Sequence, residues 1–199
     1  MKTILLTVSL FLFFSINAQI TVYPYVEDFE AGAGGWTVTG GLWELGTPSG
    51  AVINSAAGGV NSWATNLAGL YPNSSNAWVT SPVFDFTAIP NPLIQAAIWW
   101  DSENFWDGTV LQSSIDGGVS WQNIGALNDP NWFNFVTINS NPGGQPTGWA
   151  GSPGSLGWIN ASHDLTGLGG QGAVILRFAF ASDGSVQDDG FAFDNINIV

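Results

Sequence analysis

The last part of the sequence, AVILRFAFASDGSVQDDGFAFDNINIV (residues 173–199), decides the fold class. Large apolar side chains occupy every second position at its start: Val174, Leu176, Phe178 and Phe180. This period of two places all four on one face of an extended strand. An acidic loop with an Asp-Gly step follows, and then a second apolar run. The stretch therefore predicts two β-strands joined by a loop, both packing on a core.

The rest of the chain repeats this pattern. Short apolar or aromatic runs alternate with clusters of Gly, Asn, Asp and Pro, and no window shows sustained apolar residues at helical spacing. We expect an all-β protein, a two-sheet antiparallel β-sandwich of the jelly-roll kind. Strands are expected at residues 25–30, 42–45, 77–86, 92–100, 109–115, 121–127, 133–138, 158–164, 173–181 and 191–199.

The N-terminus has the features of an export signal. Lys2 precedes an apolar run from Ile4 to Ile16, and Ala18 offers a cleavage site. The run is short for a bilayer span, which favours a signal peptide over residues 1–18; a retained anchor is the alternative. Residues 19–199 then form a single jelly-roll domain. We expect a secreted or extracellular protein, with the cell surface and the periplasm both possible.

The mature chain is strongly acidic and lacks cysteine. Beyond residue 18, Arg177 is the one Lys or Arg against 15 Asp and Glu, which gives a formal side-chain charge of −14. Such a chain cannot neutralise phosphates, so nucleic acid and anionic membrane surfaces are disfavoured as partners. No disulfide can form either. Bound cations would relieve the repulsion between carboxylates, which is a first indication of calcium.

Several segments in order resemble one family. These are YVEDFEAGAGGW (25–36), LWELGTP (42–48), WATNL (63–67), SPVFDF (81–86), WWDSENFWDG (99–108), SIDGGVSWQNIG (114–125) and ASDGSVQDDGFAFDNINI (181–198). Together they look like a family of secreted bacterial domains, similar to MAM domains and to the C-terminal sandwich of immune-inhibitor-A-type metallopeptidases. The resemblance implies a concanavalin-like or galactose-binding-like jelly roll and a role in adhesion or in glycan or protein binding. The disulfide cysteines of MAM domains are absent here.

The resemblance also implies a structural calcium site. Similar jelly rolls tie an acidic residue of the first strand to the Asp of the last, which here means Glu30 and Asp194, with Asp28 and backbone carbonyls completing the shell. Asp194 is expected to share a face with Ile196 and Ile198, toward the core. In the alternative, Asp194 caps backbone amides or pairs with Arg177.

A second, weaker cation site is expected from two acidic loops. Each loop follows a long apolar strand and contains an Asp-Gly step, so both could lie at one end of the sandwich. Asp-Gly steps also form turns without any metal, and this is the alternative. The candidate ligands are Glu103, Asp107, Asp183, Asp188 and Asp189.

Aromatic residues in loops are the candidate ligand-binding residues. Indole rings stack on the apolar faces of sugars, and Trp106, Trp132 and Trp149 occur in loop-like contexts. Packing is the alternative for each. The segment Ser114–Trp121 fits an Asp-box pattern, which we interpret as a hairpin turn held by Asp116.

Catalytic machinery is not recognisable. His163 is the only His, so zinc-peptidase and Ser-His-Asp arrangements lack parts. We therefore expect a calcium-stabilised, non-catalytic binding or adhesion module for polysaccharide or a cell-surface protein. One alternative is a structural matrix or surface component. The other is a glycoside hydrolase or lyase, with Glu103 and Asp107 as the nearest paired carboxylates.

Overall fold

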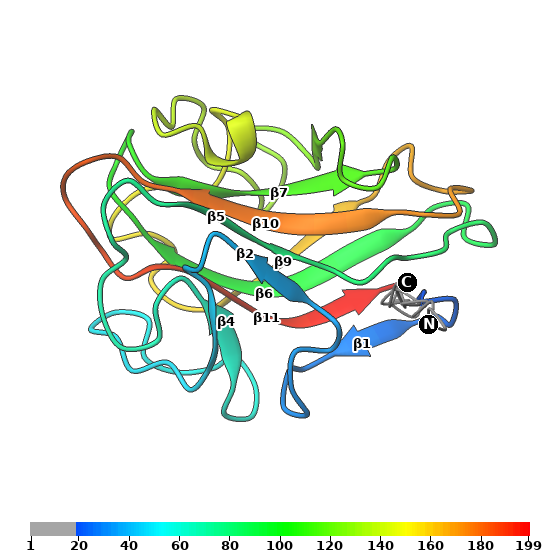
Figure 1. Ribbon diagram of the computed structural model, residues 1–199, viewed down its shortest axis with the longest axis horizontal. Coiled ribbons are helices and arrows are strands. Elements are labelled where there is room, and N and C mark those ends of the chain that lie inside the picture. The colour runs from blue at the N-terminus through cyan, green and yellow to red at the C-terminus, as the bar shows by residue number, and fades with distance from the viewer. Residues whose placement is uncertain (1–18) are drawn as a thin grey trace, which may run out of the picture.

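Two β-sheets face each other in the computed structural model, which describes residues 19–199 (Figure 1). The predicted signal peptide lies outside the described residues. The strands are β1 (Tyr25–Glu27), β2 (Thr37–Thr39), β3 (Glu44–Gly46), β4 (Ser62–Ala64), β5 (Asn76–Thr80), β6 (Leu93–Asp101), β7 (Gly108–Ser114), β8 (Gln122–Asn123), β9 (Ile159–Asp164), β10 (Ile175–Ala181) and β11 (Gly190–Ile198). A short 3₁₀ turn, η1, spans Pro142–Gly144.

The strands pair antiparallel within each sheet. The first sheet has the order β3-β4-β11-β6-β9, with β1 also paired to β11, and the second has the order β2-β5-β10-β7-β8. Two of the connections cross between the sheets: β6 of the first sheet leads to β7 of the second, and β10 of the second leads to β11 of the first. The predicted two-sheet antiparallel sandwich is confirmed.

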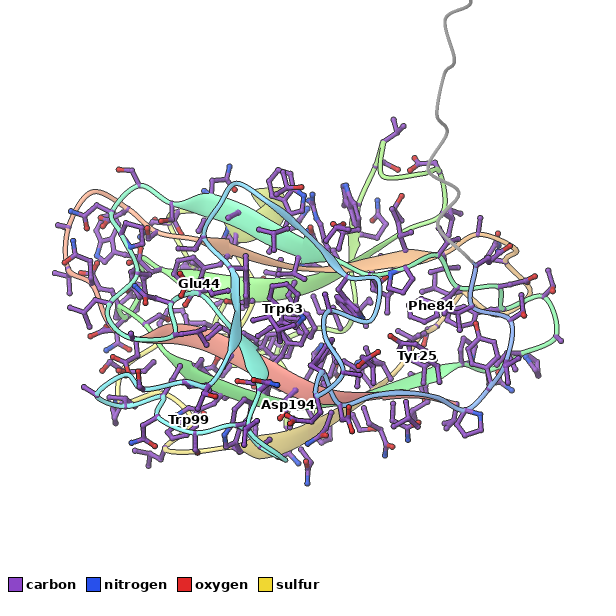
Figure 2. All side chains as sticks on the ribbon, turned by 60° about the horizontal axis from the view of Figure 1, so that its bottom comes forward. Tyr25, Glu44, Trp63, Phe84, Trp99 and Asp194 are labelled. Carbon is purple, nitrogen blue, oxygen red and sulfur yellow. The ribbon has the colours of Figure 1, made fainter. Side chains whose placement is uncertain are left out.

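Aromatic side chains fill the space between the sheets. Figure 2 shows Trp63 and Phe84 among the side chains between the two layers. At the centre Phe178 of β10 stacks on Phe193 of β11, with ring centroids 4.2 Å apart. The four residues that the sequence placed on one face, Val174 just before β10 and Leu176, Phe178 and Phe180 within it, are all buried, as predicted. Each such side chain contributes about 1.5–3 kcal/mol by leaving water, so this core is the main stabilising element.

Some predicted strands are shorter or absent. Residues 133–138 make only an isolated bridge, between Phe135 and Gly148, because the segment folds across an open edge of the sandwich. The strand predicted at 77–86 ends at Thr80, and Pro82, which lacks an amide donor, follows it. Strands β2 and β4 were not predicted, since three residues are too few for a period to be visible.

The last strand contains a bulge that changes which side its residues face. Phe193 pairs with Ile98 and Asp194 with Ala97, but the register shifts before Asn197, and Asn195 has a φ of 50°. The predicted common face of Asp194 with Ile196 and Ile198 is therefore wrong. Asp194 lies on the outer face of the first sheet, where a small second core includes Ile53.

Candidate functional site

The two acidic loops meet at one end of the sandwich. Asp101 at the end of β6 pairs with Gly190 at the start of β11, and Ala181 at the end of β10 pairs with Gly108 at the start of β7. Loops 101–108 and 182–190 therefore cross between the sheets side by side, at the left of Figure 1. The sequence prediction that both lie at the same end is correct.

Three of the five predicted acidic ligands converge here. Glu103, Asp107 and Asp183 each present a carboxylate oxygen, and these atoms lie within 4.8 Å of one another. Asp107 has no exposed surface: it accepts hydrogen bonds from the Tyr71 hydroxyl at 2.9 Å and from the Asp183 amide at 2.7 Å. We call Glu103, Asp107 and Asp183 the acidic triad.

The electrostatics of the triad disfavour three free carboxylates. Burial, assisted by the charges of Asp183 and Glu103, raises the pKa of Asp107 to about 6. Burial and the charges of Asp183 and Asp188 also raise the pKa of Glu103. Glu103 Oε2 is buried without a hydrogen-bond partner. A cation at this position would satisfy that oxygen and lower both pKa values.

Asp188 and Asp189 do not join the triad. Asp189 turns to the outer face of the first sheet, where its Oδ2 accepts hydrogen bonds from the amides of Val52 and Ile53 at 2.6 and 2.7 Å. Asp188 is half-buried; burial and then the charges of Asp101 and Asp189 raise its pKa.

An exposed aromatic pair lies on the same loop as the triad. Phe105 is 57% exposed and Trp106 is 44% exposed. Their carbonyls accept hydrogen bonds from the amides of Asn139 and Ser140, both at 2.9 Å, and the Phe105 ring packs edge-on against Phe135. The rings are thus presented to solvent on a backbone that is held in place.

Two predicted ligand-binding tryptophans are core residues instead. Trp132 and Trp149 are almost fully buried, their ring centroids are 5.0 Å apart, and Trp149 also contacts Phe178. They close the edge of the sandwich beside β7, where Trp149 exchanges two backbone hydrogen bonds with Thr109. Placing them in a binding site was wrong, because their loop wraps inward.

Glu30 and Asp194, the predicted calcium pair, meet at a loop rather than directly. Asp194 is fully buried, and its Oδ2 accepts hydrogen bonds from the amides of Ala57 and Gly58. Glu30 Oε1 accepts hydrogen bonds from the amides of Val60 and Asn61 in the same loop. The hydrogen bonds thus agree with the alternative interpretation, in which Asp194 caps backbone amides. Asp28 is exposed and accepts from the Glu30 amide.

Arg177 does not pair with Asp194 or with any other described carboxylate. Its Nε donates to Gln112 Oε1 at 2.9 Å, and its guanidinium lies between Trp121 and Trp78, at 4.0 and 4.9 Å from the ring centroids. Burial lowers its pKa to about 10. The aromatic faces thus take the place of a carboxylate. Within residues 19–199 the one ion pair joins His163 to Asp129.

Sequence reasoning missed Tyr71, which organises the triad. Its hydroxyl donates to Asp107 and accepts from the Glu103 amide at 3.1 Å. Nothing in a lone Tyr after a Gly-Leu step marks this role. The Asp116 turn, by contrast, has the expected contacts: the carboxylate accepts hydrogen bonds from Ser114, Val119 and Ser120, which lowers its pKa.

Comparisons with known proteins place the fold in context. No family model matches the sequence. Bacillopeptidase F of Bacillus subtilis (strain 168) is 27% identical over 185 residues, which is 89% of this chain and 11% of that protein. The chain therefore spans about a ninth of the curated relative that it matches.

Among solved structures, the K1 cleaved adhesin domain of Lys-gingipain from Porphyromonas gingivalis W83 superposes with a TM-score of 0.51 and 14% identity, over 89% of this chain and 98% of that one. The K2 cleaved adhesin domain of Lys-gingipain gives 0.50 and 14%, over 88% and 98%. These likenesses show a shared β-sandwich fold.

Across residues 19–199 no helix is long and apolar enough to cross a membrane.

Proposed function

We propose that this protein is a secreted, calcium-stabilised binding or adhesion module of the MAM-like type, which recognises a polysaccharide or a cell-surface partner without catalysis. The observation that carries the proposal is the exposed pair Phe105 and Trp106, held beside the acidic triad. Rigid exposed rings offer contact area at little entropic cost on binding. Sharing a fold with domains described as adhesins supports this role.

The negative charge of the module favours uncharged partners over anionic ones. The triad and Asp188 place negative charges at the same end as the aromatic pair, so an uncharged polysaccharide suits this end better than an anionic one. A glycoside hydrolase is less well supported, since Asp107 has no exposed surface with which to reach a glycosidic oxygen.

Calcium has two proposed positions. The triad fits calcium, because three carboxylates present adjacent oxygens, none of them forms an ion pair within residues 19–199, and one oxygen lacks a hydrogen-bond partner. The pair Glu30 and Asp194 fits less fully, because backbone amides already satisfy part of both carboxylates. At either position the ion would join loops and remove repulsion.

Binding to insoluble neutral polysaccharides, measured by depletion from solution, tests the proposal. We expect the mature protein to bind one of cellulose, xylan or galactan, and Trp106→Ala or Phe105→Ala to weaken binding by about tenfold, or roughly 1.4 kcal/mol. Val119→Ala, at a site 87% exposed on a distant turn, is the matched control. Equal binding by all variants would contradict the proposed surface, and release of soluble sugar would favour the enzymatic alternative.

A further inference from the structure

A cavity opens where the two sheets end side by side. Strand β9 is an edge of the first sheet and β8 is an edge of the second. Between them, and between the loops that follow each strand, lies a cavity of about 330 Å³. This volume is at the lower end of the range of small-molecule sites. The cavity is separate from the acidic triad and from the exposed aromatic pair.

Polar residues occupy core-facing positions in this cavity. His163 pairs with Ile94, and Ser113 follows Leu111 on the same face of β7; both Ile94 and Leu111 belong to the core. The strand pattern would place apolar residues at these positions, yet they hold His, Ser and, opposite Ser113, Gln122. Polar residues on the core face of a strand weaken packing and are expected at functional sites.

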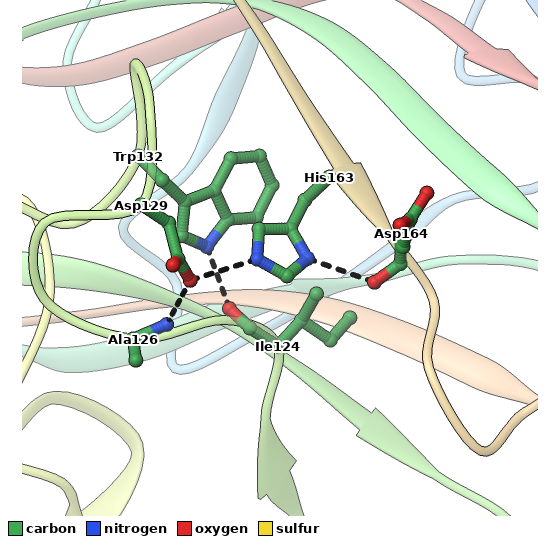
Figure 3. Close-up of polar contacts among 6 residues, drawn as sticks. All are labelled: Ile124, Ala126, Asp129, Trp132, His163 and Asp164. Atoms are coloured by element: carbon green, nitrogen blue, oxygen red, sulfur yellow. Dashed lines mark hydrogen bonds and ion pairs between the residues drawn. The ribbon is translucent and has the colours of Figure 1, made fainter.

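The wall of the cavity is organised by His163 (Figure 3). Its Nε2 lies 2.9 Å from Asp129 Oδ2, and its Nδ1 lies 2.8 Å from the carbonyl oxygen of Asp164. The ring packs against Trp132, whose Nε1 donates to the Ile124 carbonyl at 2.6 Å. Because both ring nitrogens already face acceptors, His163 holds the wall in place and offers no free charged donor to a ligand.

Gly125 shows that this packing is specific. Its φ is +81°, and a Cβ atom there would lie 2.3 Å from Trp132 Nε1 and 2.8 Å from His163 Nε2. A larger residue would displace the ring that forms the wall.

The lining matches one class of ligand. Apolar side chains of Ile124, Leu165 and Leu168 form one part, and the Ser113 hydroxyl and the Gln122 amide form another. Neither polar side chain makes a hydrogen bond within residues 19–199, although only 5% of Ser113 is exposed. A purely apolar ligand would leave these groups unpaired, and an anion would meet the carboxylate of Asp164, which lines the cavity.

We propose that this cavity binds a single uncharged sugar ring, with its C–H face on the apolar part and its hydroxyls on Ser113 and Gln122. The inference deepens the proposed function by adding a second recognition point, and it rests on that function. A neutral monosaccharide offers both the apolar face and the hydroxyl groups that the lining requires.

Titration of the ¹⁵N-labelled mature protein with glucose, galactose, xylose and galacturonic acid, followed by NMR, tests this. We expect one neutral sugar to shift the amides of Gly125 and Gly167 and the side-chain amide of Gln122. Galacturonic acid is expected to leave them unchanged. Ser113→Leu, which fills the cavity, and Gln122→Ala are each expected to weaken binding by about tenfold. Gln145→Ala, outside the cavity, is the matched control.

The outcomes separate this inference from the proposed function. Shifts confined to residues 103–107 would overturn the cavity site and leave the Trp106 surface standing. No shift with any neutral sugar would also overturn the cavity site, while polysaccharide depletion decides the proposed function independently. Equal shifts with galacturonic acid would overturn the neutral class. If Ser113→Leu fails to fold, Gln122→Ala at the rim still decides the result.

Discussion

Glu30 and Asp194, from opposite ends of the described chain, hold the same turn. Asp194 accepts hydrogen bonds from the amides of Ala57 and Gly58 at 3.0 and 3.1 Å, and Glu30 accepts from those of residues 60 and 61 at 2.9 and 2.7 Å. Gly59 between them has a φ of +59°, and a Cβ there would lie 2.4 Å from Glu30 Cδ. Converging amides thus supply the positive potential that a chain with one Arg otherwise lacks.

Removing the Asp194 carboxylate is expected to be strongly destabilising. Asp194→Ala leaves the amides of Ala57 and Gly58 without their charged acceptor under the outer loop, at a cost of roughly 2–4 kcal/mol. Urea unfolding of the protein comprising residues 19–199 measures this. Asp85→Asn, at an exposed turn, is the control and is expected to cost under about 1 kcal/mol. An Asp194→Ala variant as stable as wild type would show that the loop is held by other contacts.

Calcium is expected to raise the melting temperature. At a hundred times its dissociation constant, calcium adds about 2.7 kcal/mol to the free energy of unfolding relative to EDTA. Loss of this increment in Asp183→Asn, with retention in Glu30→Gln, would place the ion at the acidic triad. The reverse pattern would place it between Glu30 and Asp194. An unchanged melting temperature in calcium would remove the metal from the proposal.

Without calcium, stability is expected to fall as the pH rises from about 4 to about 7. The pKa of Asp107 is raised to about 6 in the folded protein from its ordinary value of 3.8. The stability that it contributes is therefore fully present below about pH 4 and is lost as the pH rises through about 6, by roughly 2 kcal/mol. Burial raises the pKa of Asp101 and of Asp188 as well, so they act in the same direction.

The measurement is urea unfolding in EDTA across this pH range, with Asp107→Asn as the comparison. The amide cannot ionise, so its stability is expected to vary less with pH than that of wild type. The lowered pKa of Asp129, caused mainly by its hydrogen bond to His163, has its effect at lower pH, below the ordinary Asp value. A wild-type stability that increases from about pH 4 to 7 would contradict the raised pKa of Asp107 in the acidic triad.

Period-two alternation was sufficient to predict the sheets but not the faces of every residue. The alternation from Val174 to Phe180 predicted four buried side chains correctly, because regular strands preserve parity. In β11 a single extra residue near Asn195 reverses the parity, and the sequence there contains only an Asn, which tolerates positive φ, as a sign of it. The acidic loops were predicted to meet because each follows a long strand. The cavity beside His163 was not predicted, because it depends on where two edge strands of different sheets end.

The sequence did not distinguish buried from exposed tryptophans in loops, but the effects of replacing Trp149 and Trp106 on the stability of the protein can be compared by experiment. Trp149→Ala is expected to cost about 3–5 kcal/mol, because the ring fills the edge of the core against Trp132 and Phe178. Trp106→Ala is expected to cost under about 1 kcal/mol, because the ring is exposed. Thermal unfolding of both variants in calcium measures this difference. If Trp106→Ala were the more destabilising change, its weaker polysaccharide binding would reflect unfolding, and the exposed aromatic pair would lose its support as the recognition surface.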